Sequence, residues 1–474
     1  MPPSHGEGGG GELTRPGGTA RSPAPDPRPR AGGGRVRAIA RALWWTSVYL
    51  FLVLFPLLVL LAAPAREGAG LWWDFSMGLG FAGLAVMGIQ FALTARFRRA
   101  SAPFGIDVIY QFHRWVGVGG LLLVVAHYAI LRTGFPDALG PASPTSAPGY
   151  MTAGRLALFL FGLVVVTSLW RRALRIEYYR WRILHGVVST AAVVLAALHI
   201  QGAGYYTSVR WTRILWIAYS VFWVLLIVYV RLVKPARLLR RPYRVTEVRA
   251  ERGDAWTLTF EPVGHAGLTF GPGQFVWLTL GGSPFRFREH PFSLSGSAED
   301  PGSLAITIKE LGDFTRTVKD TEAGATAYLD GPHGVFSPDN HPAAPGFVFV
   351  AGGVGIAPIM SMLRTLADRG DRRPMVLVYG NADRESVIFR DELEALRSRL
   401  DLRVVHVLED PPEGWTGERG LITGEIVRRA LPPRASELHY FICGPTPMSE
   451  AVQKALRDQG VPLRRVHFEL FNMV

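Results

Sequence analysis

The sequence contains a single cysteine, Cys443, among its 474 residues. One thiol excludes an internal disulfide and a metal cluster held by several thiolates, so any bound metal must have other ligands. Acidic residues are also scarce, with 38 Asp plus Glu against 51 Lys plus Arg and a formal net charge of +13. Much of the basic excess lies beside hydrophobic stretches, in RFRR, RRALR and KPARLLRR. This position favours an anionic membrane surface, and not nucleic acid, as the partner of the basic residues.

Large apolar side chains are almost absent from the N-terminal segment, which is dominated by Gly, Pro and Arg. Such a segment cannot bury enough surface to offset its chain entropy, so residues 1–36 are expected to form a disordered tail. The stretch that follows has the basic, apolar and Ala-x-Ala-like order of a secretory signal peptide. Its apolar run of about twenty residues is too long for the usual signal peptide, which favours a retained membrane helix.

The N-terminal half contains long apolar runs with few charged residues. Each could cross about 30 Å of hydrocarbon; they occupy residues 38–63, 71–95, 107–132, 153–170, 181–201 and 212–233. The sequence therefore predicts a six-span transmembrane domain over residues 37–236. Arg and Lys gather before the first span, after the second, between the fourth and fifth, and after the sixth, so both termini are expected in the cytoplasm of a multi-pass plasma or inner membrane protein.

The C-terminal half has a different pattern. After residue 241, short β-rich runs such as WTLTF, QFVWLTL and LAITI are broken by Gly and Pro, which predicts an antiparallel β-barrel over residues 241–342. From residue 346 to the end, strands alternate with helical stretches, which is typical of a parallel α/β sheet. The expected fold is thus a multi-domain membrane protein, with a six-helix bundle followed by these two soluble domains.

Two predicted spans carry histidines at the same interval, in HRWVGVGGLLLVVAH (113–127) and HGVVSTAAVVLAALH (185–199). Fourteen residues on an α-helix turn by about 1400°, within about 40° of a whole number of turns, and rise about 21 Å. Each helix therefore presents its two imidazoles on one face. Both helices run in the same direction, so His113 shares its depth with His185, and His127 with His199.

An imidazole pair at one depth is suited to bind a haem iron from both axial positions. Gly117, Gly119 and Gly120 would let a flat macrocycle approach the backbone. Histidines in membrane helices also bond one another or line a proton path, but the repeated spacing on two correctly oriented spans favours two haem b groups. Six-coordinate iron has no open position, so such haems carry electrons.

The soluble half has a pattern typical of nucleotide binding. Haem accepts single electrons whereas a nicotinamide donates a hydride, so a flavin is needed between them. In GFVFVAGGVGIAPIMSML a strand runs into Gly352, Gly353 and Gly355 and then into a helix, which brings backbone N–H groups onto a pyrophosphate. The alternative is a tight turn without ligand.

The choice of nicotinamide nucleotide depends on YGNADRES. Arg384 could meet the 2′-phosphate of NADPH, whereas the neighbouring Asp383 could meet the ribose hydroxyl of NADH. We expect NADPH on the basis of Arg384.

From about residue 105 to 474 the sequence resembles the NADPH oxidase and ferric reductase family, whose members join a bis-haem six-helix domain to a ferredoxin-NADP reductase-like module. The resemblance implies that His113, His127, His185 and His199 are haem ligands. It rests also on HPFSLSGS (290–297), KELGDFT (309–315), GPHGVF (331–336), AGGVGIAP, CGPTPM and the C-terminal FELF.

The resemblance implies contacts with FAD in the barrel. Residues 290–292 would meet the isoalloxazine, the serine that follows would lie near flavin N5, and two glycine turns would border the pyrophosphate. The implied FAD-binding residues are His290, Pro291, Phe292, Ser293, Gly312, Thr315, Gly331 and Gly334. Core packing and ordinary turns are the alternative readings of these positions.

The resemblance also implies the hydride-transfer site. Cys443, followed by Gly444 and Pro445, would lie beside the nicotinamide ring, with Glu469 near the hydride and Phe471 against the flavin. The catalytic set implied is Ser293, Cys443, Glu469 and Phe471. The sequence departs from the family in running three residues beyond this aromatic.

These features predict a transmembrane oxidoreductase that moves electrons from cytoplasmic NAD(P)H through FAD and two haems to an acceptor on the far side. Oxygen giving superoxide is the expected acceptor, because the outer connection TGFPDALGPASPTSAPGY has no carboxylate or histidine cluster to gather metal ions. A ferric-chelate reductase, an electron donor to a protein and a transporter with a flavin module are the alternatives. No obligate protein partner is evident. Arg132, Tyr205, Tyr206 and Arg210 would either line an acceptor pocket or serve as interfacial anchors.

Overall fold

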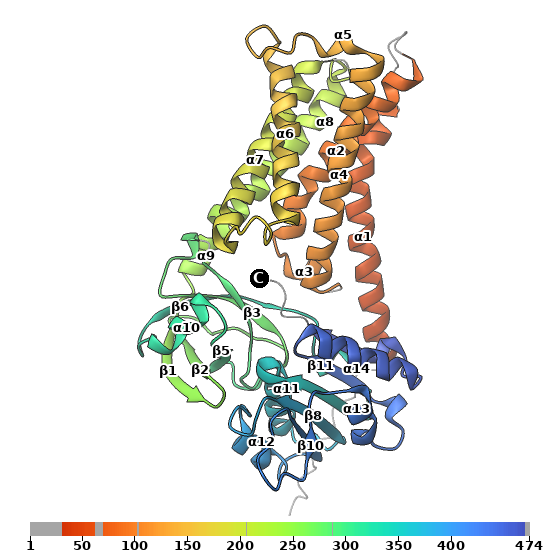
Figure 1. The fold of residues 1–474 in the computed structure, drawn as a ribbon. Coiled ribbons are helices and arrows are strands. Elements are labelled where there is room, and N and C mark those ends of the chain that lie inside the picture. Colours follow the sequence, from red (N-terminus) through yellow and green to blue (C-terminus); the bar gives the residue numbers. More distant parts are fainter. Residues whose placement is uncertain (1–30, 62–69, 102–103, 205, 287, 470–474) are drawn as a thin grey trace, which may run out of the picture.

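The computed structural model describes residues 31–61, 70–101, 104–204, 206–286 and 288–469. A bundle of long helices lies at one end of the molecule, and two sheet domains lie side by side at the other (Figure 1). Most of the predicted disordered tail, residues 1–30, lies outside the described residues, and the first helix begins at Ala31.

The predicted six-helix bundle is confirmed, since six helices among the described residues are long and apolar enough to cross a membrane. They are α1 (Ala31–Leu61), α2 (Leu71–Thr94), α4 (Ile106–Gly134), α6 (Gly149–Leu169), α7 (Tyr178–Ala203) and α8 (Arg210–Val228). The last span continues through a π-helical turn, Tyr229–Val233, into α9 (Lys234–Leu239). Two short helices, α3 (Arg98–Ser101) and α5 (Pro136–Leu139), lie in the connections.

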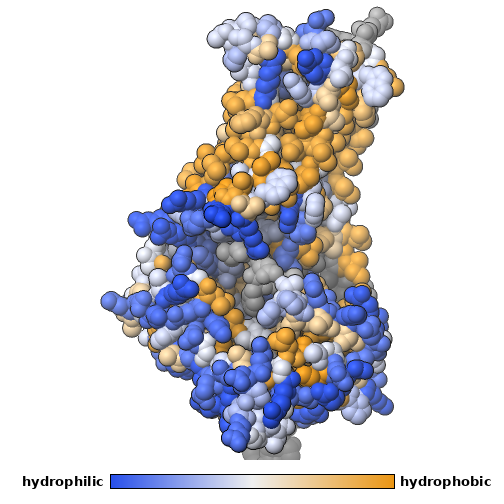
Figure 2. All heavy atoms as spheres, in the orientation of Figure 1, coloured by the Kyte–Doolittle hydropathy of each residue, from blue (hydrophilic) through white to orange (hydrophobic). Residues whose placement is uncertain are grey.

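The outer surface of the bundle is apolar. Leu122 is 63% exposed and Phe159 65% exposed, and Figure 2 shows hydrophobic residues across the face of the bundle that is in view. Exposed apolar side chains along helices of this length are suited to lipid and not to water. The buried core between the helices is small and rich in large aromatic side chains, with Trp216, Trp223 and Phe81 at its centre.

The first sheet domain is an antiparallel sheet with strand order β4-β3-β6-β1-β2-β5. Its strands are β1 (Tyr243–Glu251), β2 (Ala255–Pro262), β3 (Phe275–Leu280), β4 (His290–Ser293), β5 (Leu304–Lys309) and β6 (Thr326–His333). Leu258, Phe260, Leu278 and Ile306 are fully buried at its centre. A short helix, α10 (Asp313–Thr317), lies between β5 and β6.

The second sheet domain is parallel throughout, with strand order β10-β9-β8-β7-β11-β12. Its strands are β7 (Phe347–Gly352), β8 (Met375–Asn381), β9 (Leu402–Leu408), β10 (Glu418–Arg419), β11 (His439–Cys443) and β12 (Val466–Glu469), and its helices are α11 (Ile356–Asp368), α12 (Arg390–Leu396), α13 (Gly424–Ala430) and α14 (Thr446–Asp458). The order reverses between β7 and β11. Ligands of open α/β sheets bind at the carboxyl ends of strands at such a switch point, which is where the glycine-rich turn after β7 lies.

Candidate functional site

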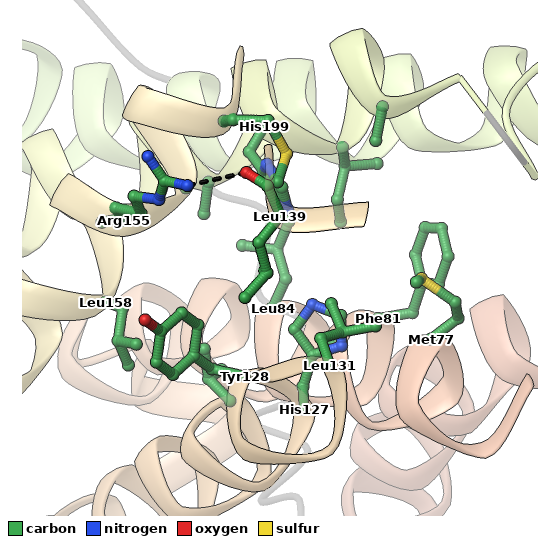
Figure 3. A pocket seen from close by; sticks show the side chains of 18 of the residues that line it. Met77, Phe81, Leu84, His127, Tyr128, Leu131, Leu139, Arg155, Leu158 and His199 are labelled. Carbon is green, nitrogen blue, oxygen red and sulfur yellow. Dashed lines mark hydrogen bonds between the residues drawn. The ribbon is translucent and has the colours of Figure 1, made fainter. Parts of the chain in front are cut away.

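The outer histidine pair, His127 on α4 and His199 on α7, lines one cavity of about 120 Å³. The two rings approach this cavity from opposite walls (Figure 3). His127 Nδ1 lies 2.8 Å from the carbonyl oxygen of Ser76, and His199 Nδ1 lies 2.9 Å from that of Tyr150. A carbonyl only accepts, so each Nδ1 carries the proton. Each Nε2 is left with its lone pair, as an axial metal ligand requires.

Two glycines on neighbouring helices make room for the outer imidazoles. A Cβ at Gly154 of α6 would lie 2.6 Å from His199 Nδ1, and one at Gly80 of α2 would lie 3.2 Å from the His127 ring. Both contacts are too close for an alanine unless the ring moves. Because these two positions are glycines, the imidazole rings can pack directly against the backbones of α2 and α6. Sequence reasoning missed both, because a glycine in an apolar helix carries no local sign of what it faces.

The inner pair, His113 on α4 and His185 on α7, has its ring centroids 6.2 Å apart with an angle of 61° between the planes. His185 Nδ1 lies 3.1 Å from Ser168 Oγ, and the Trp181 ring packs at 5.0 Å from the His185 ring. His113 Nδ1 is buried, and no partner for it is found among the described residues. The predicted depth pairing is therefore found in the structure.

The residues present fit haem. An imidazole–metal bond of about 2 Å on each side of an iron would hold two ring centres roughly 6 Å apart, close to the 6.2 Å of the inner pair. At the outer pair the fixed tautomers free both Nε2 atoms. Of the glycines expected to admit a macrocycle, Gly119 faces open space, whereas Gly120 packs against Val86 and Met87 of α2. The expectation is therefore wrong for Gly120, because the close packing of α2 on α4 uses it.

The predicted flavin strand is β4, the edge strand next to β3. Two side chains of α10 and β4 form an aromatic stack, with the His290 and Phe314 rings 4.0 Å apart and 15° from parallel. Phe292 lies beside Phe314, at 6.0 Å. Phe314 was not singled out in the sequence. Its stacking brings α10 and the glycine turn before it onto the strand.

The two predicted glycine turns have different surroundings. The N–H groups of Leu311 and Gly312 both donate to Thr315 Oγ1 at 2.8 Å, so Thr315 shapes the turn at the start of α10. Gly331 lies within β6, two residues before its end, and Gly334 directly follows β6. Gly334 has a positive φ of 96°, and a Cβ there would lie 3.2 Å from the Phe275 ring and 3.6 Å from Glu469 Oε1.

The two nicotinamide motifs meet at the carboxyl edge of the parallel sheet. Cys443 pairs with Ala351 in the register of β11 and β7. A Cβ at Gly355 would lie 2.2 Å from the Cys443 carbonyl oxygen, and one at Gly352 would lie 2.8 Å from the Pro445 ring. Only glycine permits this approach of the turn 352–355 to the segment 443–445, so the predicted residues form one site. The positive φ of Gly353, 54°, completes the turn.

The loop after β8 contains Asp383 and Arg384, the residues expected to distinguish NADPH from NADH. Asp383 Oδ1 accepts the N–H of Ser386 at 2.7 Å, and Ser386 Oγ also contacts the backbone of Asp383. The Asp383 carboxylate is thus used within its own turn, whereas Arg384 is exposed.

Ser293, Cys443 and Glu469 come together between the two sheet domains. Cys443 and Glu469 are register partners on β11 and β12, and Ser293 Oγ lies 3.5 Å from Glu469 Oε2. Burial, reinforced by the carboxylate of Asp107 at the start of α4, raises the pKa of Glu469 to about 8. Burial also raises the pKa of the Cys443 thiol well above its usual value, so the thiol is neutral. Phe471 lies outside the described residues.

A buried ion-pair network joins the bundle to the barrel. Glu289, directly before β4, accepts from Arg96 at 2.5 Å and from Arg182 of α7. Burial alone would raise the pKa of Glu289, but the two guanidinium groups hold it below its usual value. Arg182 lies three residues before His185, so the network ties the flavin strand to the helix of the inner pair.

The same junction includes a second carboxylate. Asp330 of β6 lies 2.8 Å from Lys234 Nζ and 3.5 Å from the guanidinium of Arg96, which in turn lies 4.5 Å above the Trp277 ring. From the sequence, Arg96, Arg182 and Lys234 indicate only the orientation of the spans. Their acidic partners are far away in the sequence and gave no local signal.

The residues expected at the outer surface are only partly in the cavity. Tyr206 lines it and hydrogen-bonds to Asp74, Arg132 and Arg210 are exposed, and Tyr205 lies outside the described residues. Arg155 of α6 was missed. It lines the cavity and donates to the carbonyl of Leu139 at 2.7 Å (Figure 3), which fixes the outer connection against α6.

Three family profiles match successive parts of the chain. They are described as ferric reductase like transmembrane component (residues 79–198), FAD-binding domain (243–342) and oxidoreductase NAD-binding domain (349–454). The chain belongs to the NADPH oxidase and ferric reductase family. It is a membrane oxidoreductase with six candidate spans, and its soluble half consists of an FAD-binding and an NAD(P)H-binding domain.

Two curated relatives each match about half of this chain. The Pseudomonas aeruginosa glycine betaine monooxygenase reductase subunit is 32% identical over 49% of this chain and 64% of its own length. Ferredoxin–NADP reductase B of Sorangium cellulosum is 34% identical over 45% of this chain and 91% of its own. The chain spans slightly less than two thirds of the first of these relatives.

Solved structures are similar at a lower level. The cytochrome P450 reductase GcoB of Amycolatopsis is 26% identical over 49% of this chain and 69% of its own, with a TM-score of 0.44. A flavohemoglobin from Malassezia yamatoensis is 15% identical over 84% of this chain and 96% of its own, with a TM-score of 0.45.

Proposed function

We propose that this family member carries electrons from NAD(P)H, through FAD and two haem b groups, to an acceptor on the opposite side of the membrane. The observation that supports it best is the junction network, in which Glu289 binds Arg182 three residues from His185. When bound, a flavin divides a hydride into single electrons, and a haem with two axial imidazoles passes single electrons on.

The residues at the nicotinamide edge have separable roles. The glycine turn 352–355 and the segment 443–445 hold the nucleotide at the sheet edge, and the neutral Cys443 thiol packs beside the nicotinamide. Glu469, with a pKa of about 8, holds a proton at neutral pH. It can exchange that proton with Ser293 Oγ, 3.5 Å away.

NADPH is the proposed nucleotide, because Arg384 is exposed while the carboxylate of Asp383 is engaged in its own turn. An exposed charge pair contributes up to about 1 kcal/mol. Arg384→Ser is therefore expected to raise KM for NADPH by roughly fivefold and to leave KM for NADH unchanged. Equal KM changes for both nucleotides would contradict this assignment.

Oxygen is the proposed acceptor. The outer pair is surrounded mainly by apolar side chains such as Leu84, Leu158 and Phe161, which suit a small apolar acceptor that is reduced at the haem edge. The described outer connection, residues 135–148, has a single carboxylate, Asp137, which is a poor collector of ferric ion. A ferric-chelate reductase and an electron donor to an extracytoplasmic protein are the alternative functions.

The orientation is part of the proposal. Arg96, Arg182 and Lys234 lie at the junction end of the bundle, and basic residues favour the cytoplasmic side. The termini and both soluble domains would then be cytoplasmic in a plasma or inner membrane, with the outer pair facing the other side.

The acceptor is tested by NADPH-driven reduction of cytochrome c by the purified, FAD-supplemented protein, with and without superoxide dismutase. Loss of the signal with dismutase is expected, since superoxide would be the carrier. An unchanged signal would contradict the oxidase assignment. It would favour direct electron transfer to a metal or protein acceptor instead. Absence of NADPH oxidation by a protein that holds flavin and haem would contradict the function as a whole.

A further inference from the structure

Three histidines gather near the amino-terminal ends of strands β11 and β12, at the end of the parallel sheet opposite the nicotinamide site. His341 lies in the segment that joins the barrel to β7, His439 begins β11, and His467 lies on β12. One ligand nitrogen from each lies within 4.8 Å of the others. Neither the haem pairs nor the reductase motifs account for this cluster.

The rings already contact one another. His439 Nδ1 and His467 Nε2 lie 3.0 Å apart, with the ring planes 9° from parallel. His341 packs over both, with its ring centroid 4.3 Å from that of His439 and 4.1 Å from that of His467. Imidazoles from three separate segments are thus in mutual contact.

The imidazoles are neutral at neutral pH. Burial, with the neighbouring imidazoles, lowers the pKa of His341 to about 4 and that of His467 to about 3. Burial and the guanidinium groups of Arg465 and Arg464 lower the pKa of His439 as well. Neutral imidazole is the form that binds metal, and the half-buried rings remain open to solvent.

We propose that His341, His439 and His467 form a binding site for a divalent transition-metal ion of the zinc, nickel or copper class. Imidazole nitrogen suits these ions, whereas calcium and magnesium require oxygen ligands. A tetrahedral ion with bonds of about 2.1 Å separates its ligand atoms by about 3.4 Å. His439 Nδ1 and His467 Nε2, now 3.0 Å apart, need to separate only slightly as the metal replaces their shared proton.

A metal here would fasten the interdomain segment to the sheet. His341 comes from that segment, whereas His439 and His467 belong to adjacent strands whose other ends carry Cys443 and Glu469. The site lies about four strand residues, or roughly 13 Å, from Cys443 along β11. The ion is therefore structural and takes no part in hydride transfer.

Equilibrium dialysis of zinc against the full chain, purified with flavin and haem and without a polyhistidine tag, tests the site. The wild type is expected to bind one zinc more per chain than His467→Gln does. His341→Gln and His467→Gln should each weaken zinc binding at least about tenfold, because each removes one of three ligands. His406→Gln is the matched control, since His406 is half-buried but lies outside the cluster.

Haem and flavin absorbance select folded protein, so misfolding of a variant does not count as lost zinc binding. A second readout uses the wild type alone, because zinc that binds the folded state raises the unfolding temperature. If the wild type takes up no more zinc than His467→Gln, or if His406→Gln loses as much binding, the cluster is a hydrogen-bonded imidazole stack and the proposal is overturned.

Discussion

The two histidine pairs are held in different ways. In the outer pair both imidazoles donate to main-chain carbonyls, those of Ser76 and Tyr150. In the inner pair His185 meets the hydroxyl of Ser168, and His113 Nδ1 has no partner among the residues that the structure describes. The outer site is thus fixed by how the helix backbones pack.

The inner site depends more on what surrounds the bundle. Arg182, one turn before His185, is held by Glu289 of the barrel, so docking of the reductase module helps to position the helix of the inner pair. The outer site is therefore built by the bundle alone, whereas the inner site also depends on the junction. Perturbing the junction should therefore affect the inner site first, whereas perturbing helix packing should affect the outer site.

Removal of an outer ligand is expected to have the largest effect. His127→Ala or His199→Ala should leave one haem per chain and abolish electron transfer to the far side, because the outer site has no substitute imidazole among its described lining residues. Haem content by pyridine haemochrome and reduction of ferricyanide, which accepts electrons from the flavin directly, measure the two halves separately. Two haems in either variant would mean that the ligand assignment is wrong.

Breaking the junction is expected to be the next largest perturbation. Glu289→Gln leaves the guanidinium groups of Arg96 and Arg182 without their shared carboxylate, and losing one partner of a buried pair costs about 3–5 kcal/mol. Haem reduction by NADPH in anaerobic stopped flow should slow, while flavin reduction keeps its rate.

The matched control for the junction is Glu299→Gln. Glu299 pairs with Arg369 but its side chain is 46% exposed, so the change should cost less than about 1 kcal/mol. Equal slowing of haem reduction in both variants would show that the junction has no special part in electron transfer.

Replacing Gly154 or Gly80 with alanine should weaken haem binding at the outer site selectively. Gly154→Ala places a methyl group 2.6 Å from His199 Nδ1, and Gly80→Ala places one 3.2 Å from the His127 ring. We expect Gly154→Ala to lower outer-haem affinity by about tenfold to a hundredfold, as other changes behind a metal-bound histidine do, and Gly80→Ala to have a smaller effect.

Control substitutions for Gly154→Ala and Gly80→Ala are available on the same two helices. Gly162 of α6 and Gly78 of α2 have nothing within 4 Å of an added Cβ, so Gly162→Ala and Gly78→Ala should keep both haems. Redox titration of the two haems resolves the outcome, and a change confined to the inner haem would contradict the role given to Gly154 and Gly80.

Glu469 gives the smallest and most local prediction. Its pKa is raised from the ordinary 4.5 to about 8 in the folded protein, so the folded state keeps a proton that the unfolded chain releases. Its contribution to stability therefore falls as pH rises from about 4.5 to about 8 and is constant above that range. Glu469→Gln should remove this slope, together with any inflection near pH 8 in flavin reduction. A pH profile identical to that of the wild type would exclude Glu469 as the titrating group.

Sequence reasoning succeeded where the geometry is local. The 14-residue spacing placed four histidines in two pairs because the pitch of an α-helix is fixed, and the turn 352–355 was recognisable because a strand and a helix flank it. It failed where contacts join distant segments. Glu289 lies 193 residues from Arg96 and 107 from Arg182, so no local pattern in the sequence points to these contacts.

The other residues that were not predicted depend on how the helices are rotated and on which distant segments the fold brings together. Gly80 and Gly154 became significant only when the structure showed which imidazole each one faces. The three clustered histidines lie on three segments that only the folded sheet brings together. Arg155 was passed over because its partners are carbonyl groups of a loop, which have no sequence signature.

The most direct test of electron transfer through the stacked histidine pairs uses sealed proteoliposomes with NADPH outside and cytochrome c inside. For molecules oriented with the reductase module outward, we predict reduction of the enclosed cytochrome c that is lost in His127→Ala and His199→Ala, while ferricyanide outside is still reduced. Reduction of the enclosed cytochrome c by either variant at the wild-type rate would contradict the proposed path across the membrane.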